Sequence, residues 1–359
     1  MKTASLITVH VGFNFGSVLQ TIATVKQLEK LNIHTIVLNY IPDRAKTSSF
    51  LFSAKGLRLV KRVLFLPNYL INKHVYSRYL RKHVSLTEPF YSDDPTPDHG
   101  EDYHITGSDQ VWNYSYNGGI DEHYFFKGVN GHKLALSSSM GTENPCEDEL
   151  KAFDVFLPSY SGISVREASA KTILTSRGFN VEQLIDPTFF LSKEEWIPYM
   201  SDRLIKDKYL LVYTPYNVVD KEAIYKVARK IAKERNLLIV TFSWDYFTDS
   251  YADKTVRYAS PGDFLSLMYY SEVVITNSFH GTAFSINLNK DFLVFMPSTF
   301  STRISSILDL FKLNERLVSD FSESCLPVSP IDYKRVSDII SAEQKRAQDF
   351  LNNAMNLCI

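Results

Sequence analysis

The chain has 359 residues, of which 45% are hydrophobic and 13% aromatic, so its length favours about two domains with sizeable cores. The formal net charge of −1 gives no electrostatic reason to expect nucleic acid as a partner. Cys146, Cys325 and Cys358 stand far apart, which indicates reduced thiols in a cytoplasmic protein. The apolar run at the N-terminus is too short for a signal peptide, and no window has the length of a transmembrane helix.

The first elements predict a parallel sheet. We expect a strand at Ala4–Val9, a helix at Ser17–Leu31 and a second strand at His34–Asn39. A strand, loop, helix and strand in this order are typical of parallel pairing. Gly12 and Gly16 in the loop do not complete the glycine pattern of a dinucleotide site, so such a site is only weakly indicated.

A basic segment, residues 44–87, interrupts this pattern. It contains ten Lys or Arg residues and no Asp or Glu, interleaved with apolar side chains. One interpretation is a pair of surface helices whose lysine and arginine stems cover the core. The other is a basic amphipathic face that contacts an anionic membrane surface or a lipid-linked phosphate. The stretch 88–101, rich in Pro and Asp, is expected to be a loop.

Four more strands are predicted before residue 191, and each ends in a short polar cluster. They are Tyr103–Thr106, Lys133–Ser138, Gly162–Val165 and Val181–Ile185. The carboxyl ends of parallel strands meet at one edge of a sheet. We therefore expect Asn14, Asp109, Ser138 and Arg166 to converge there.

The alternation of strands and helices begins again at Tyr209, which predicts a second domain. The predicted boundaries are 1–191 for an N-terminal α/β domain with the basic insertion 44–87, 192–208 for a linker, 209–341 for a C-terminal α/β domain and 342–359 for a C-terminal helix. The expected fold is α/β, with two Rossmann-like doubly wound domains facing a cleft. Across that cleft His280 would face Arg166.

The stretch Glu272–Leu288 predicts an anion site. Its β-branched run Val273–Ile275 is typical of a buried strand, and Ser278 is a good N-cap for a helix that follows. Backbone N–H groups at such a strand-to-helix turn hold anions. His280 lies in this turn, where a bound anion would let it donate a proton near neutral pH. The alternative is a loop histidine that hydrogen-bonds a neighbouring carbonyl.

Two arginines follow predicted strands. Arg166 is either a surface residue paired with Glu167 or a fork for a carboxylate or phosphate. Arg303 occupies a similar position after the strand Phe292–Phe295. Together with one helix N-terminus, the two arginines would suit a small dianion or trianion.

Asp109, Gln110 and Trp112 favour a sugar site as strongly as they favour a simple helix cap. A carboxylate and an amide bind hydroxyl groups, and an indole packs against the C–H face of a sugar ring. Asn14 and Gln20 are similar but weaker candidates. No group of His, Asp or Glu has metal-ligand spacing, so no metal is predicted.

Five motifs together resemble the polysaccharide pyruvyl transferase family. They are Asn14-Phe-Gly16 with Leu19-Gln20, Gly107-Ser-Asp-Gln-Val-Trp112, Ser164-Val-Arg-Glu167, Asp186-Pro187 and Ser278-Phe-His-Gly281. The resemblance implies an architecture like that of GT-B glycosyltransferases. It also implies transfer of pyruvate from phosphoenolpyruvate onto a sugar as a cyclic ketal, with no separate cofactor.

The resemblance implies that His280 matches the donor-site histidine of the family and Arg166 its donor-binding arginine. Our own hypothesis is that His280 is the catalytic acid and that Asp109 orients or deprotonates an acceptor hydroxyl. From residue type and position we expect donor binding by Arg166, Ser278, Gly281, Thr282 and Arg303, and acceptor binding by Asn14, Gln20, Gln110 and Trp112. Some members carry an arginine where this chain has Ser278, so Arg303 or a lysine would stand in for it.

The expected acceptor is a sugar of a polysaccharide or of its lipid-linked precursor, and the basic segment 44–87 would then contact the inner face of the membrane. Two alternatives remain open. One is a nucleotide-sugar glycosyltransferase of the same architecture, although no ribose-binding carboxylate follows a glycine loop in the second half. The other is a non-catalytic relative that binds an anion or a sugar.

Overall fold

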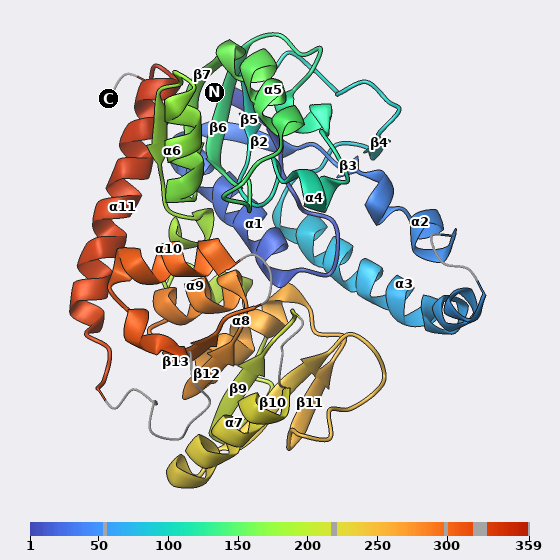
Figure 1. Ribbon diagram of the computed structural model, residues 1–359, viewed down its shortest axis with the longest axis vertical. Helices are drawn as coiled ribbons and strands as arrows, with labels where there is room; N and C mark the ends of the chain where they lie inside the picture. Colours follow the sequence, from blue (N-terminus) through green and yellow to red (C-terminus); the bar gives the residue numbers. More distant parts are fainter. Residues whose placement is uncertain (53–55, 217–220, 298–300, 319–328, 358–359) are drawn as a thin grey trace. The chain divides into compact units, whose positions relative to one another are not determined.

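The computed structural model describes residues 1–52, 56–216, 221–297, 301–318 and 329–357 (Figure 1). The chain forms two compact units. Unit 1 comprises Met1–Leu66, Leu80–Leu191 and Ile340–Ile359, and unit 2 comprises Pro67–Tyr79 and Ser192–Ile339. Among the described residues, every helix is too short or too polar to cross a membrane.

Unit 1 is built on a six-stranded sheet whose strands all run parallel, as the sequence predicts. Its strands are β1 (Lys2–Ile7), β2 (Ile33–Val37), β5 (Tyr103–Thr106), β6 (His132–Ser138), β7 (Tyr160–Val165) and β8 (Val181–Gln183). Their order is β2-β1-β5-β6-β7-β8. The chain therefore moves outward in both directions from the β1–β5 pair, which is the point where such a sheet changes direction.

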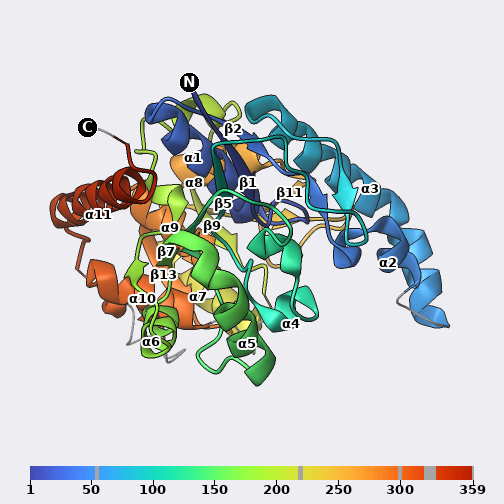
Figure 2. The same cartoon turned by 90° about the horizontal axis from the view of Figure 1, so that it is seen from above.

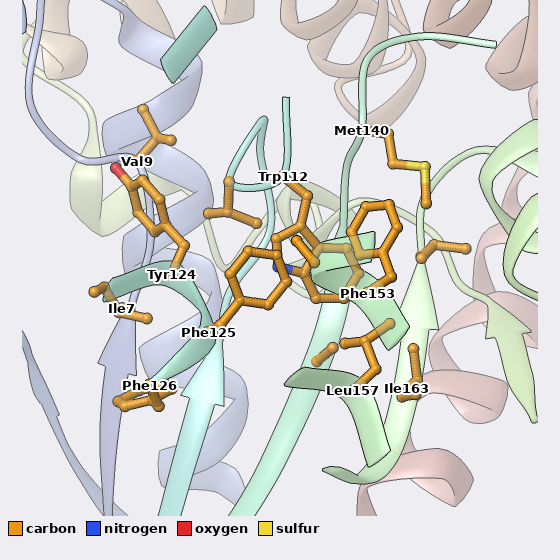
Figure 3. Packing of buried hydrophobic residues seen from close by; sticks show 14 of the residues in the cluster. Ile7, Val9, Trp112, Tyr124, Phe125, Phe126, Met140, Phe153, Leu157 and Ile163 are labelled. Atoms are coloured by element: carbon orange, nitrogen blue, oxygen red, sulfur yellow. The ribbon is translucent and has the colours of Figure 1, made fainter. Parts of the chain in front are cut away.

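Helices and short turns complete unit 1. They include α1 (Phe15–Lys30), α2 (Thr47–Phe52), α4 (Tyr114–Asn117), α5 (Glu147–Phe156), α6 (Ala168–Ser176) and the 3-10 turn η4 (Pro187–Phe189). Figure 3 shows the aromatic centre of the core, where the rings of Trp112 and Phe125 stack at 5.7 Å and Phe153 meets the indole edge-on at 5.6 Å. Because α5 supplies Phe153, this cluster fixes α5 onto the sheet.

Unit 2 also has a six-stranded parallel sheet. Its strands are β9 (Tyr209–Tyr213), β10 (Leu238–Ser243), β11 (Lys254–Arg257), β12 (Val273–Thr276), β13 (Asp291–Phe295) and β14 (Leu317–Val318). Their order is β11-β10-β9-β12-β13-β14, which is 3-2-1-4-5-6 when the strands of this unit are numbered along the chain. This is the strand order of dinucleotide-binding Rossmann folds. Its helices are α7 (Lys221–Arg235), α8 (Pro261–Tyr270), α9 (Phe279–Asn287) and α10 (Ser301–Phe311).

The predicted α/β class with two doubly wound parallel sheets is confirmed, and several local details differ. The sequence reading missed β11 and β14, and the stretch predicted as a loop contains β4 (Phe90–Tyr91), which pairs with β3 (Tyr40–Ile41). β4 and β14 have two residues each, too few to show a hydrophobic period, and β11 is an edge strand without a buried residue. Cys146 is an exposed free thiol, whereas Cys325 and Cys358 lie outside the described residues.

Two segments differ from their predicted domain assignments. Residues 192–208, expected to be a linker, belong to unit 2, where the fully buried Trp196 meets the ring of Phe284 edge-on at 5.2 Å. The helix assigned to residues 342–359 is the C-terminal part of α11, which spans Tyr333–Ala354. In unit 1 a Cβ on Gly162 of β7 would lie 2.6 Å from the Cβ of Ala354, so the glycine allows α11 to approach the sheet closely.

Lys290 is a largely buried cation in unit 2, between α9 and β13. Its ammonium donates to the carbonyl of Ser271 at 2.9 Å. Burial is the main cause, and nearby Lys193 the second, of a pKa for Lys290 that is lowered to about 8 from its ordinary value of 10.5. Below about pH 8 both the folded and the unfolded chain carry this proton, and the folded chain bears the cost of a desolvated charge.

We expect the stability difference between Lys290→Met and the wild type to depend on pH. From about pH 8 to 10.5 the unfolded state binds more of this proton, so the wild type regains stability as the pH rises. The free energy of unfolding of the variant, relative to that of the wild type, should therefore be highest at neutral pH and fall toward pH 10.5. Urea unfolding at both ends of this range measures the difference. Lys345→Met, at an exposed position of α11, is the control, and a difference that stays constant with pH for Lys290→Met would contradict the prediction.

Candidate functional site

The β12–α9 turn of unit 2 lies at the place where its sheet changes direction. β12 neighbours β9, and Thr276 and Tyr213 pair in register at the carboxyl ends of these strands. In open α/β sheets ligands bind outside the carboxyl ends of the strands at this switch point. The predicted anion site, Ser278–Gly281, therefore occupies the position where a ligand of this fold is expected.

The geometry of the turn depends on close packing between α9 and the strand ends. The Thr276 hydroxyl donates to the carbonyl of Tyr213 at 2.7 Å and accepts from the N–H of Ser278 at 3.1 Å. A Cβ on Gly281 would lie only 2.2 Å from that hydroxyl oxygen. Glycine at position 281 thus lets the first turn of α9 lie directly against β12.

Ser278 is the N-cap of α9, as the sequence predicts. Its hydroxyl accepts from the N–H of Gly281 at 3.4 Å, and its carbonyl accepts from the Thr282 hydroxyl at 3.0 Å. The first N–H groups of an α-helix have no acceptor inside the helix, so the helix presents a partial positive charge here. The hydroxyls of Ser278 and Thr282 shape this helix end, and their predicted contact with a donor stays a prediction.

His280 and Arg303 both contact the ring of Phe279. The imidazole meets this ring edge-on, with 5.1 Å between ring centres, and the Arg303 guanidinium carbon lies 5.7 Å from the ring centre. His280 and Arg303 are each only 2% exposed. One helix N-terminus, one imidazole and one guanidinium therefore surround a single aromatic ring, and this set suits a compact anion.

The predicted convergence at the carboxyl edge of the unit 1 sheet is confirmed. Asp109 follows β5 in the left-handed region, with φ of 68°, and forms a bridge with Ser138 after β6. The Ser17 hydroxyl in α1 donates to the Asp109 carboxylate at 2.5 Å, and Asn14 caps the same helix. The N–H of Arg166 donates to the carbonyl of Ser138 at 3.0 Å.

Arg166 forms a buried ion cluster inside unit 1 with two carboxylates. Its guanidinium donates to Asp186 and lies 3.7 Å from Asp109, and all three side chains are less than 5% exposed. Burial opposes the charged form of Arg166, but Asp186, Glu167 and Asp109 outweigh it and raise the pKa of the guanidinium. Asp186 also accepts from the N–H and the hydroxyl of Thr188, so it is a turn residue and a counter-ion together. This arrangement favours a structural role for Arg166, and its donor contact stays a prediction.

The predicted acceptor residues take part in the packing of unit 1. Trp112 is a core residue, stacked on Phe125, so its indole is not an open platform for a sugar ring. The amide of Gln20 donates to Thr8, and Gln110 accepts from Asn113 at 2.7 Å. The acceptor contacts predicted for these residues and for Asn14 stay predictions, and their positions favour support of the β1 and β5 loops.

One possible metal-ligand group occurs among the described residues, although the sequence predicts no metal site. Ligand atoms of Asp98, Glu101 and His104 lie within 4.8 Å of one another. Asp98 already accepts from the N–H of Gly100, Glu101 accepts from the N–H of His99, and His104 Nδ1 bonds the Ser5 hydroxyl at 2.8 Å. These bonds explain the group as a self-capped turn, and we assign no metal to it.

Comparison with known proteins identifies the family. The family model described as polysaccharide pyruvyl transferase matches residues 14–299. The chain belongs to the polysaccharide pyruvyl transferase family. The match spans both sheet edges described above and contains Ser278-Phe-His-Gly281, whereas Arg303 lies just beyond it.

Solved structures show that this pyruvyl transferase family member shares the fold of UDP-N-acetylglucosamine 2-epimerases. One such epimerase aligns with a TM-score of 0.56 at 14% identity, covering 98% of this chain and 95% of that chain. The enzyme from Methanocaldococcus jannaschii aligns with a TM-score of 0.51 at 12% identity, covering 95% and 92%. At such identities the likeness concerns the fold alone. No curated protein sequence matches the chain.

We expect Gly281→Ala to destabilise unit 2 by about 1–3 kcal/mol, because the new methyl group would overlap the Thr276 hydroxyl. Together with Thr276→Ala, the loss of unfolding free energy should be smaller than the sum of the two single losses, because the overlapping oxygen is then absent. Urea unfolding of the wild type, both single variants and the double variant gives the coupling. Additive costs would contradict the proposed packing constraint.

Asp186→Ala should cost about 3–5 kcal/mol, because it leaves the buried Arg166 without its nearest carboxylate. Asp154→Ala is the matched control in the same unit: it removes the partner of Arg177 in an exposed ion pair and should destabilise the protein far less. Denaturant unfolding measures both. An equal loss of unfolding free energy in the two variants would show that Asp186 is not needed to balance the buried charge of Arg166.

Proposed function

We propose that this protein transfers the pyruvyl group of phosphoenolpyruvate onto two hydroxyls of a sugar as a cyclic ketal and releases inorganic phosphate. The observation that carries the proposal is the position of His280, in the first turn of α9 at the switch point of the unit 2 sheet. The family match supports it, because the matched range includes this turn.

The charge of the donor fits the chemistry of this turn. Phosphoenolpyruvate carries a phosphate and a carboxylate on three carbons. The α9 N-terminus would hold one of these anionic groups, and Arg303 would hold the other, since a guanidinium forms two parallel hydrogen bonds to a carboxylate or phosphate. Ser278, as N-cap, keeps the helix end in place where some family members have an arginine.

In the proposed reaction His280 acts as the general acid. It gives a proton to the methylene carbon of the donor, and C2 becomes an oxocarbenium-like centre that a sugar hydroxyl attacks. The C2–O bond to phosphate then breaks, and a second hydroxyl closes the ketal ring. The protons of this reaction balance, because one of the two hydroxyl protons restores His280 and the other leaves with the phosphate.

The acceptor in this proposal is a sugar of a polysaccharide or of its lipid-linked precursor on the cytoplasmic side of a membrane. We assign it to the carboxyl edge of the unit 1 sheet, where Asp109 follows β5 at the second switch point. An exposed free thiol at Cys146 agrees with a reducing compartment.

We expect His280→Gln to lower the rate of phosphate release by at least about a hundredfold, because a neutral amide cannot supply the proton. Purified protein is incubated with phosphoenolpyruvate and a panel of sugar acceptors, and inorganic phosphate is measured. His34→Gln, at an exposed position of β2, is the matched control and should retain activity. Circular dichroism verifies that both variants are folded.

Phosphate release that requires an acceptor supports the transferase. Near wild-type turnover by His280→Gln would remove His280 from the chemistry. Release of a nucleotide from a nucleotide sugar would replace the proposal with a glycosyltransferase. Binding of phosphoenolpyruvate without turnover for every acceptor in the panel would favour a non-catalytic relative.

A further inference from the structure

The basic segment 44–87 contains one long helix, α3 (Leu57–His83), whose outer face is unusually apolar. Twelve large hydrophobic side chains are strongly exposed among the described residues, and five of them belong to this helix. They are Val60, Val63, Leu64, Leu70 and Ile71, with exposures of 42% to 64%. Such a concentration of exposed apolar side chains marks an interaction surface.

These side chains lie on one face of α3. Val63 and Leu64 follow Val60 by three and four residues, and Leu70 and Ile71 follow Val63 and Leu64 by seven, which places all five on one side of the helix. The same spacing continues to Arg78, Arg81 and Lys82, which are also exposed. The outer face therefore has an apolar N-terminal half and a basic C-terminal end, and we call it the α3 stripe.

The opposite face of α3 is fixed by polar contacts in unit 2. Asn72 donates to the carbonyl of Trp244 at 2.6 Å, and the Trp244 indole donates to the Tyr76 hydroxyl at 3.2 Å. Asn68 accepts from the Tyr258 hydroxyl. Because these contacts hold the inner face of residues 67–79, this part of α3 cannot rotate to bury Leu70 and Ile71. In Figures 1 and 2, α2 and the first turns of α3 lie on the outside of unit 1, away from its sheet.

We propose that the α3 stripe is a docking surface for an anionic lipid bilayer. The charge of the surrounding segment selects this occupant, because residues 44–87 carry ten basic and no acidic side chains. Lysine and arginine near a membrane are attracted to anionic headgroups, while the apolar side chains enter the boundary between headgroups and acyl chains. A helix that lies in the membrane surface requires this combination and does not need to span the bilayer.

Vesicle flotation with the full chain tests the proposal. Wild-type protein should bind vesicles of phosphatidylcholine with about 30% phosphatidylglycerol and bind poorly to phosphatidylcholine alone. Raising NaCl from about 0.05 M to about 0.5 M should release most of it, because salt screens the basic residues. No donor or acceptor is present, so the result is independent of the reaction proposed above.

Two variants separate the apolar and basic parts of the stripe. Leu64→Ser combined with Ile71→Ser should weaken binding about tenfold or more. Arg78→Gln combined with Lys82→Gln should weaken it about fivefold per charge. Lys226→Gln combined with Lys233→Gln, at exposed positions of α7, removes the same charge elsewhere and should leave binding near the wild-type level.

Equal binding to both kinds of vesicle, or wild-type binding by either stripe variant, would overturn the proposal. Sedimentation without vesicles measures whether the protein forms a dimer. A dimer that the Leu64→Ser, Ile71→Ser variant abolishes would show that a second copy of the chain covers the stripe instead of a membrane.

Discussion

The hydroxyl of Thr276 fixes the turn on which the proposed donor site depends. It joins the end of β9 to the end of β12 through the Tyr213 carbonyl, and it also receives the N–H of Ser278. Its closeness to Gly281 leaves no room for a side chain at that position of α9. The backbone of the first turn of α9, which carries His280, is therefore positioned by the Thr276 hydroxyl and by the close approach of Gly281.

The two sheets have similar edges with opposite electrostatic character. In unit 1 the guanidinium of Arg166 is already balanced by the carboxylates of Asp186 and Asp109. In unit 2 the corresponding edge combines a helix N-terminus with His280 and Arg303 around one aromatic ring. A compact trianion suits the second edge, because a helix N-terminus and a guanidinium both attract anionic groups.

The sequence predicts the fold class and the position of the β12–α9 turn well, because strong local signals mark both. A β-branched run, a serine cap and a glycine follow one another at Val273–Gly281. The roles of Arg166 and Trp112 are harder to predict, since each depends on residues distant in the chain. Nothing local indicates that Asp186 pairs with the arginine, or that Phe125 covers the indole.

The most direct measurement is the crystal structure of the protein in complex with phosphoenolpyruvate. We predict that one anionic group of the donor lies within hydrogen-bonding distance of the first backbone N–H groups of α9, that the methylene carbon lies beside His280, and that the Arg303 guanidinium binds the other anionic group. A donor bound instead to Arg166, with the first turn of α9 making no contact to it, would contradict the account.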